Sequence, residues 1–147
     1  MSDDGVMIEG LVPHAGAMVL LDGVVAWDAG VIRCSARSHL DGGNPLRRAG
    51  RLGAVCGVEY GLQAAAVHGA LREGGVQAAG YVARLRDVVL HVPYLDEAGF
   101  GVLTVEAALL RAEGGGMVYA LRVMAEDGRV LVEGGATIAL PAAVAAA

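Results

Sequence analysis

The chain has 147 residues, of which 55% are hydrophobic and 18% are charged, and its formal net charge is −5. This length suits one domain with a real core, and the acidic balance argues against general nucleic-acid binding. So apolar a composition predicts that part of the surface is buried against another subunit. We therefore predict a single domain over residues 1–147, with peripheral or frayed ends at 1–10 and 142–147.

The first half of the chain reads as a strand hairpin followed by a helix. Residues 18–27 and 31–37 are strand-like, and Asp-Ala-Gly at 28–30 suits a hairpin turn between them. Residues 38–51 are polar and turn-rich, which predicts a loop. Residues 53–71 lack β-alternation and are long enough for one helix, despite interior glycines that each cost about 1 kcal/mol. That cost makes sense if the bare positions let a sheet approach the helix closely.

The second half reads as a run of antiparallel strands. Turn signals at 96–99, 114–116 and 127–128 separate four strand-like segments, which cover residues 80–92, 101–112, 117–126 and 129–140. The order predicts an α+β domain in which one antiparallel sheet wraps around one long central helix. Open sheet edges need covering, so edge-to-edge dimerisation is expected.

Glu59 is the only formal charge between Arg51 and Arg72. Burying an isolated carboxylate is costly, so it either raises its pKa or finds a partner, and both outcomes suit acid/base chemistry. A structural ion pair with an arginine such as Arg84 is the alternative. The segment is just long enough to span a membrane, but Glu59, Gln63 and His68 inside it argue against a span.

Several of these segments resemble one enzyme family. Residues 11–14 (LVPH) and 18–22 (MVLLD) are similar to the opening LPHR-x-P-F-L-L-V-D stretch of the 3-hydroxyacyl-acyl-carrier-protein dehydratases of the FabZ/FabA type, and residues 59–63 (EYGLQ) to their helix motif E-A-L-A-Q. The similarity spans about residues 11–141 and is nearest to the dehydratase-like proteins of aryl-polyene pathways. It implies a hot-dog fold and a lyase that forms a 2,3-unsaturated acyl thioester in fatty-acid or polyene-type biosynthesis.

This resemblance also implies roles for residues near the start of the helix. Glu59 would be the acid that protonates the leaving hydroxyl or the group that holds the lost water, and Gln63, one turn on, would orient its carboxyl. Backbone N–H groups near Gly53 and Ala54 would stabilise charge on the thioester oxygen. The family's loop histidine, in a G-H-F-P sequence, is absent here, so His14 is the candidate base. His14 as a turn residue that bonds to backbone is the alternative.

The remaining histidines are weaker candidates. His39 lies in a loop and is expected to be solvated, His68 is expected to face away from Glu59, and His91 reads as strand packing. No pair of histidines has metal-ligand spacing, so we predict no metal. No resident cofactor is expected either, because the substrate would be carried on phosphopantetheine of a carrier protein or coenzyme A.

Arg47, Arg48 and Arg51 form a basic cluster just before the helix. In an acidic protein such a cluster suits an acidic acyl carrier protein or a phosphopantetheine phosphate, and ordinary surface ion pairs are the alternative. The expected partners are thus an acyl carrier protein and a second subunit, in a homodimer or in a heterodimer with a related hot-dog protein.

Three further functions stay open beside the active lyase. The missing loop histidine favours a catalytically impaired subunit that partners an intact dehydratase. A lone Glu59 on the central helix also fits a hot-dog acyl thioesterase. The last possibility is a module that binds an acyl chain without reacting.

Overall fold

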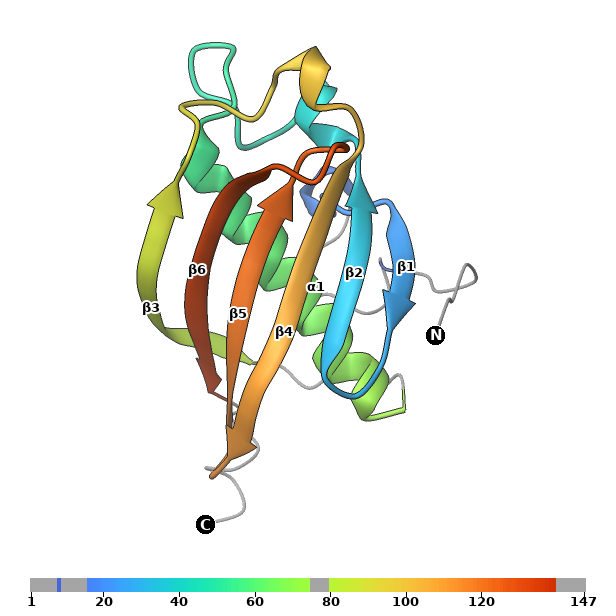
Figure 1. Cartoon of the computed structure of the whole chain (residues 1–147), viewed down its shortest axis with the longest axis vertical. Coiled ribbons are helices and arrows are strands. Elements are labelled where there is room, and N and C mark those ends of the chain that lie inside the picture. Colours follow the sequence, from blue (N-terminus) through green and yellow to red (C-terminus); the bar gives the residue numbers. More distant parts are fainter. Residues whose placement is uncertain (1–7, 9–15, 75–79, 140–147) are drawn as a thin grey trace.

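The computed structural model describes residue 8, residues 16–74 and residues 80–139. Within them, a six-stranded sheet curves around one face of a single long helix (Figure 1). The strands are β1 (Gly23–Trp27), β2 (Val31–Ala36), β3 (Tyr81–Leu90), β4 (Leu103–Glu113), β5 (Gly116–Met124) and β6 (Val130–Ala139), and α1 is Gly57–Arg72. All strand pairs are antiparallel, and the order across the sheet is β1-β2-β4-β5-β6-β3. The predicted α+β hot-dog architecture is confirmed.

Two details differ from the sequence prediction. The first predicted strand, 18–27, is shorter, because residues 16–18 form a 3-10 turn and the strand begins only at Gly23. The four later strands do not form one simple meander. β4, β5 and β6 follow one another, but β3 pairs with β6 at the far edge and not with β4. The chain therefore crosses the width of the sheet between β3 and β4.

Gly57 and Gly61 allow the sheet to approach the helix closely, as predicted from the glycines in this segment. A Cβ at Gly57 would lie 2.9 Å from Val132 Cγ2, and a Cβ at Gly61 would lie 2.9 Å from Leu121 Cβ. The helix can therefore approach β5 and β6 only because these two positions carry no side chain. Gly53 does not share this role, since nothing lies within 4 Å of its Cβ position.

The sheet has a buried inner face and a charged outer face. Ile32, Cys34, Val105 and Val123 pack toward α1 with almost no exposure. On the outer face, Arg33, Glu106, Arg122 and Glu133 stand opposite one another on four adjacent strands, in alternating charge. Glu106 bonds to both arginines, and these overcome burial to lower the pKa of its carboxyl. This row aligns the strands. No helix of the described residues covers the outer face, since α1 lies on the other side of the sheet (Figure 1).

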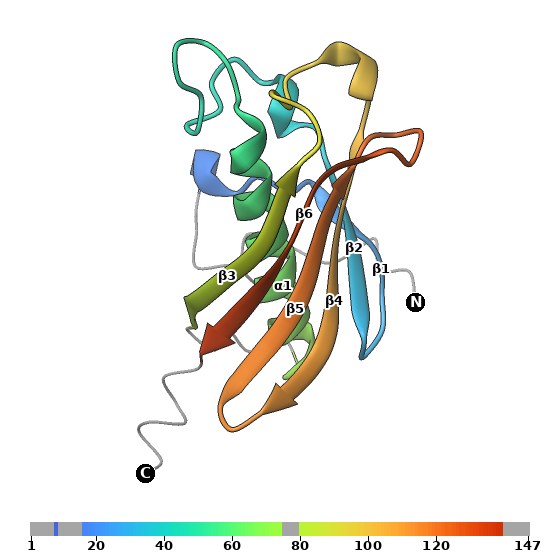
Figure 2. The ribbon, with the colours of Figure 1, turned by 60° about the vertical axis from the view of Figure 1, so that its left-hand side comes forward.

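The two ends of the sheet also differ. The loop of residues 38–53 and the connection from β3 to β4 gather at the end where α1 begins (Figure 2). They meet in short backbone contacts, in which the Ala54 N–H donates to the Pro93 carbonyl and the Leu95 N–H donates to the Leu52 carbonyl. This end therefore fixes the start of the helix, on which Glu59 lies.

Candidate functional site

Glu59 lies in the first turn of α1 and is half-buried. It is not an isolated carboxylate, because it interacts with other groups in the protein. The ion pairs of the described residues do not include one between Glu59 and Arg84. The structural alternative offered for Glu59 therefore gains no support, and its role as an acid stays a prediction.

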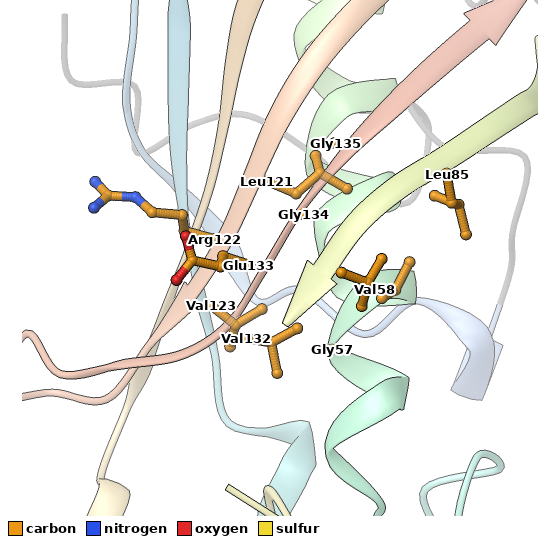
Figure 3. Close-up of a pocket in the computed structure, with 11 residues that line it drawn as sticks. Gly57, Val58, Leu85, Leu121, Arg122, Val123, Val132, Glu133, Gly134 and Gly135 are labelled. Atoms are coloured by element: carbon orange, nitrogen blue, oxygen red, sulfur yellow. The ribbon is translucent and has the colours of Figure 1, made fainter. Parts of the chain in front are cut away.

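A narrow apolar hollow lies beside this helical turn, between α1 and the inner side of β5, β6 and β3 (Figure 3). Val58, the residue before Glu59, and Gly57 form its helix wall. Leu85 and Val88 of β3 form the opposite wall, and both are exposed in the single subunit. The hollow therefore opens at the β3 edge of the sheet, close to the turn that carries Glu59. Sequence reasoning missed these two residues, because only the strand order places β3 next to this end of the helix.

Gln63 has a different set of contacts from the one predicted. Its side chain is 1% exposed, its Oε1 accepts a hydrogen bond from the Leu20 N–H at 2.9 Å, and its Nε2 donates to the Met18 carbonyl at 2.6 Å. Gln63 thus holds the segment that leads into β1 against the helix. An orienting contact with Glu59 stays a prediction.

A polar cluster that sequence reasoning did not find lies next to Gln63. The Tyr60 hydroxyl is 2.7 Å from Ser38 Oγ, which also donates to the Leu20 carbonyl at 2.7 Å. Asn44 Nδ2 donates to the Tyr60 hydroxyl at 3.1 Å, and burial raises the pKa of Tyr60. The cluster joins the helix, the loop before it and the segment leading into β1. Its members are far apart in sequence, so no local pattern could reveal it.

The helix start is only partly available for a substrate. The helix α1 follows a 3-10 turn, Ala54–Cys56, so the first backbone donors lie in that turn. The Ala54 N–H already donates to the Pro93 carbonyl at 3.0 Å. The predicted use of this N–H on a thioester oxygen must therefore be corrected, because the donor is engaged. Gly53 lies in an isolated bridge with Tyr94, and its predicted role is untested.

The three arginines before the helix do not form one free basic cluster. Arg47 donates to Asp96 at 3.3 Å and to the carbonyls of His39, Asp41 and Gly50. Arg51 pairs with Asp96 at 2.9 Å and Glu97 at 2.9 Å, and lies over the Tyr94 ring. Only Arg48 is exposed and makes no ion pair within the described part of the chain. Burial acts to raise the pKa of Asp96, but the bonds from Arg51 and from the Leu52 N–H outweigh it and lower that pKa. The internal pairs favour a structural role for Arg47 and Arg51.

The structure places the described histidines away from a common site. His68 Nε2 is 2.7 Å from the Asp28 carbonyl, which can only accept, so Nε2 carries the proton and Nδ1 accepts from the Tyr119 hydroxyl at 2.7 Å. Burial lowers the pKa of His68 and raises that of Tyr119 to about 12. His91 bonds to Glu133 on the outer face at 2.6 Å and is not a core residue.

The position of His39 contradicts the prediction that its side chain is solvated. The expected solvated loop residue is 0% exposed, and neither ring nitrogen has a hydrogen-bond partner among the described residues. Its burial lowers its pKa, so the ring is neutral near pH 7. His14, the candidate base, lies outside the described residues, and its role stays a prediction.

Neither a metal site nor a membrane span emerges from the described residues. No group of three or more His, Cys, Asp or Glu side chains among them could hold a metal ion. None of the helices in this part of the chain is long and apolar enough to cross a membrane. Cys34 is buried as a free thiol, and its burial raises its pKa to about 12.

Comparison with solved structures finds the same fold in several proteins. The dehydratase heterocomplex ApeI:P from Xenorhabdus doucetiae matches with a TM-score of 0.78 and 21% identity, over 92% of this chain and 91% of that chain. AziG from S. sahachiroi matches with a TM-score of 0.62 and 17% identity, over 88% of this chain and 97% of that chain. The Q49A variant of thioesterase PA1618 from Pseudomonas aeruginosa matches with a TM-score of 0.59 and 16% identity, over 80% and 79%.

Comparison by sequence identifies the family. No curated protein matches the chain. A family model does: the ApeP-like family, described as ApeP dehydratase, matches residues 6–147. With the hot-dog fold and the aryl-polyene-type resemblance of about residues 11–141, this match establishes a dehydratase-like function. The chain belongs to the ApeP-like dehydratase family.

Proposed function

We propose that this protein dehydrates 3-hydroxyacyl thioesters carried by an acyl carrier protein, as one subunit of a pair joined at β3. The observation that carries the proposal is the position of the hollow. It lies between the helical turn of Glu59 and β3, whose ten residues are all exposed. A long exposed edge strand with apolar side chains is a template for pairing with another chain. Pairing there would close the hollow and complete the site.

In the proposed reaction, a base removes a proton from C2 of the substrate while Glu59 protonates the hydroxyl on C3. The C3–O bond breaks, water leaves, and the electron pair forms the C2–C3 double bond, so the products are the enoyl thioester and one water. Proton transfer from a positioned acid contributes about a hundredfold to ten-thousandfold. His14 is the proposed base. A rate unchanged in His14→Ala would assign the base to the second subunit.

The second subunit is proposed to be a related hot-dog protein. This is supported by the solved ApeI:P structure, which is named as a dehydratase heterocomplex, and by the family loop histidine that residues 44–53 lack. Sedimentation of the purified chain alone and with a co-expressed, histidine-bearing hot-dog dehydratase subunit tests this. A pair with the related subunit is the expected result, and a stable self-pair that ignores the related subunit would contradict it.

Mass spectrometry of a 3-hydroxyacyl carrier protein incubated with the pair tests the reaction. The expected result is the loss of one water, at a rate reduced at least about a hundredfold in Glu59→Gln. Glu113→Gln, an exposed carboxyl at the end of β4 that does not line the hollow, is the control and should keep the rate. No loss of water with the intact pair, or an unchanged rate in Glu59→Gln, would contradict the proposal. The latter result would favour an impaired subunit.

A thioesterase is the second candidate, because hot-dog thioesterases share this fold over 80% of the chain. The same experiment separates the two functions. A thioesterase would release the acyl chain as a free acid and leave a free thiol on the carrier, without an enoyl product.

A further inference from the structure

The middle of β3, which forms one edge of the sheet (Figure 1), is a short regular stretch between two irregularities. Arg84, Leu85 and Arg86 pair residue by residue with β6, whereas the register shifts on either side of them. Because side chains alternate along a strand, both arginines lie on one face of the sheet and Leu85 lies on the other. Arg86 stands opposite Gly135, which is two residues from Glu133 on β6. The two arginines are therefore on the outer face.

Arg84 and Arg86 have no acidic partner within the described part of the chain. All ten residues of β3 are exposed, and neither arginine belongs to an ion pair among the described residues. The outer-face arginines of the interior strands differ, since Arg33 and Arg122 both bond to Glu106. The edge that would meet a neighbour thus presents two cations, two residues apart, whose charge is not balanced by this chain.

A second copy of this chain is a poor partner for this edge. In an antiparallel pair, residues that stand opposite each other point to the same face, so outer-face residues oppose outer-face residues. A twofold self-pair whose axis passes Leu85 would put Arg84 of each copy opposite Arg86 of the other. An axis at Arg84 or at Arg86 would put that arginine opposite its own copy. Like charges directly opposite each other are destabilising, so each of these self-pairs is disfavoured.

Asp87 does not relieve this repulsion. It is the one acidic residue in the sequence of β3, and it lies where the register shifts after Arg86. A continuous self-pair in which Asp87 faced Arg84 of the other copy would be shifted by one residue. Leu85 would then face Arg86, although these two side chains point to opposite faces of the strand. A one-residue shift of this kind moves every side chain to the wrong face.

We propose that Arg84 and Arg86 select the neighbour across β3, which is a hot-dog subunit with carboxylate side chains at the matching outer-face positions of its own edge strand. This inference rests on the proposed function, because it names the partner of the same interface. Opposite charges that face each other across two strands are favourable, and like charges reject the wrong partner. The arginines therefore favour a mixed pair over a self-pair, while the apolar side chains of β3 contribute contact area to either.

A charge-reversed variant of this chain supplies an acidic edge of known sequence for the test. Arg84→Glu/Arg86→Glu carries carboxylates at both positions, so it should pair with the wild-type chain. We expect the Kd of this mixed pair to be at least about tenfold lower than that of either chain with itself at low salt. The difference should shrink as NaCl is raised to about 1 M, because salt screens exposed charges. Analytical ultracentrifugation with one chain fluorescently labelled measures these affinities.

Arg111→Glu/Arg129→Glu is the matched control, because it changes the net charge equally at two exposed arginines outside β3. Mixed with the wild-type chain, it should pair no more tightly than the wild-type chain with itself. A second variant, Arg84→Gln/Arg86→Gln, removes the charges without reversing them and should strengthen the self-pair. A mixed pair of the Arg84→Glu/Arg86→Glu variant that is no tighter than the self-pairs, or an equal gain in the control, would overturn the assignment.

The related, histidine-bearing subunit separates this inference from the function on which it rests. The wild-type chain should pair with that subunit, and Arg84→Glu/Arg86→Glu should weaken the pair at least about tenfold. If the wild-type chain does not pair with it, the proposed function fails. If the wild-type chain pairs with it and the variant keeps the full affinity, the choice of partner does not lie with the two arginines. Urea unfolding should show unchanged stability in the variants, because both side chains are exposed.

Discussion

The two edge strands of the sheet are built in opposite ways. β1 has five residues and a bulge, and α1 holds both of its flanks. Gln63 binds the backbone of Met18 and Leu20 before the strand, and His68 binds the Asp28 carbonyl after it. β3 has ten residues, all exposed, with large apolar side chains at Tyr81, Val82, Leu85, Val88, Val89 and Leu90.

The difference indicates that a second subunit would pair with the β3 edge and not with the β1 edge. Both strands contain register shifts, so the difference lies in length and exposure. A short edge strand makes a poor template for another strand, whereas a long apolar edge is a strong one. Substitutions near β3 should therefore change association and activity with little effect on folding. Substitutions that break the contacts of α1 near β1 should lower stability and leave association unchanged.

Placing a charge on β3 should have the largest effect. Val82→Asp puts a carboxylate on an edge strand where the valine is 42% exposed, and burying that charge in an interface is unfavourable. We expect the affinity of the pair to fall at least roughly thirtyfold, which corresponds to about 2 kcal/mol. Analytical ultracentrifugation over a dilution series measures this change.

Val25→Asp on β1 is the matched control for this experiment. It makes the same substitution on the other edge strand, at a valine that is 51% exposed. Association should stay at the wild-type value. Equal losses in the two variants would show that the edges do not differ, and an unchanged affinity in Val82→Asp would place the interface elsewhere.

Removing the Gln63 amide should give the largest change in stability. Gln63→Ala leaves the Leu20 N–H and the Met18 carbonyl without their partner in a buried region. An unsatisfied buried group costs about 1–3 kcal/mol, so we expect unfolding free energy to fall by about 2 kcal/mol or more. Urea unfolding monitored by Trp27 fluorescence tests this. A loss below about 0.5 kcal/mol would contradict the role given to Gln63.

Acidification should lower the free energy of unfolding. Burial lowers the pKa of His68 and His39 in the folded state, while in the unfolded state each titrates near its ordinary value of about 6.5. The unfolded state therefore binds more protons as the pH falls below about 6.5, and stability present above that pH is lost. Each histidine contributes a slope of at most about 1.4 kcal/mol per pH unit.

Urea unfolding at pH 7.5, 6.5 and 5.5 measures this pH dependence. His68→Gln should lower stability at pH 7.5 and also reduce the slope, because one of the two buried rings no longer titrates. A stability that stays constant or rises as the pH falls over this range would contradict the neutral, buried state of both rings.

Removing the Tyr119 hydroxyl should have the smallest effect. Tyr119→Phe leaves His68 Nδ1 without its donor at 2.7 Å, and one such bond is worth about 1 kcal/mol. The variant should lose about that much stability and keep its association with a second subunit. Because the His68 pKa would rise without a donor that favours the neutral ring, its stability should also depend less steeply on pH.

How far the sequence could predict this molecule depends on how local each signal is. The hairpin, the helix and the later strands follow from periodicity and turn residues, and the close helix–sheet contact follows from Gly57 and Gly61. The position of β3 in the sheet does not follow from these signals, because the sequence of a strand does not indicate which strand it pairs with. For the same reason the hollow between Val58 and Val88 could not be predicted.

The candidate site shows the same division. Glu59 stands out because it is a single charge in an apolar segment, and that signal needs no tertiary structure. The roles assigned to Arg47, Arg51 and the Ala54 N–H overlooked their internal partners. Those partners, Asp96, Glu97 and Pro93, lie 39 to 49 residues away in sequence, so no local pattern could reveal them. The burial of His39 was not predicted, because the polar residues around it in sequence indicate a solvent-exposed loop.

Specific activity as a function of protein concentration tests the central claim most directly. If the site is completed by a neighbour across β3, dehydration per subunit should rise with concentration and follow the paired fraction measured by ultracentrifugation in the same samples. Full dehydration activity in samples that contain only single subunits would contradict the account, because it would show that one chain forms the whole site.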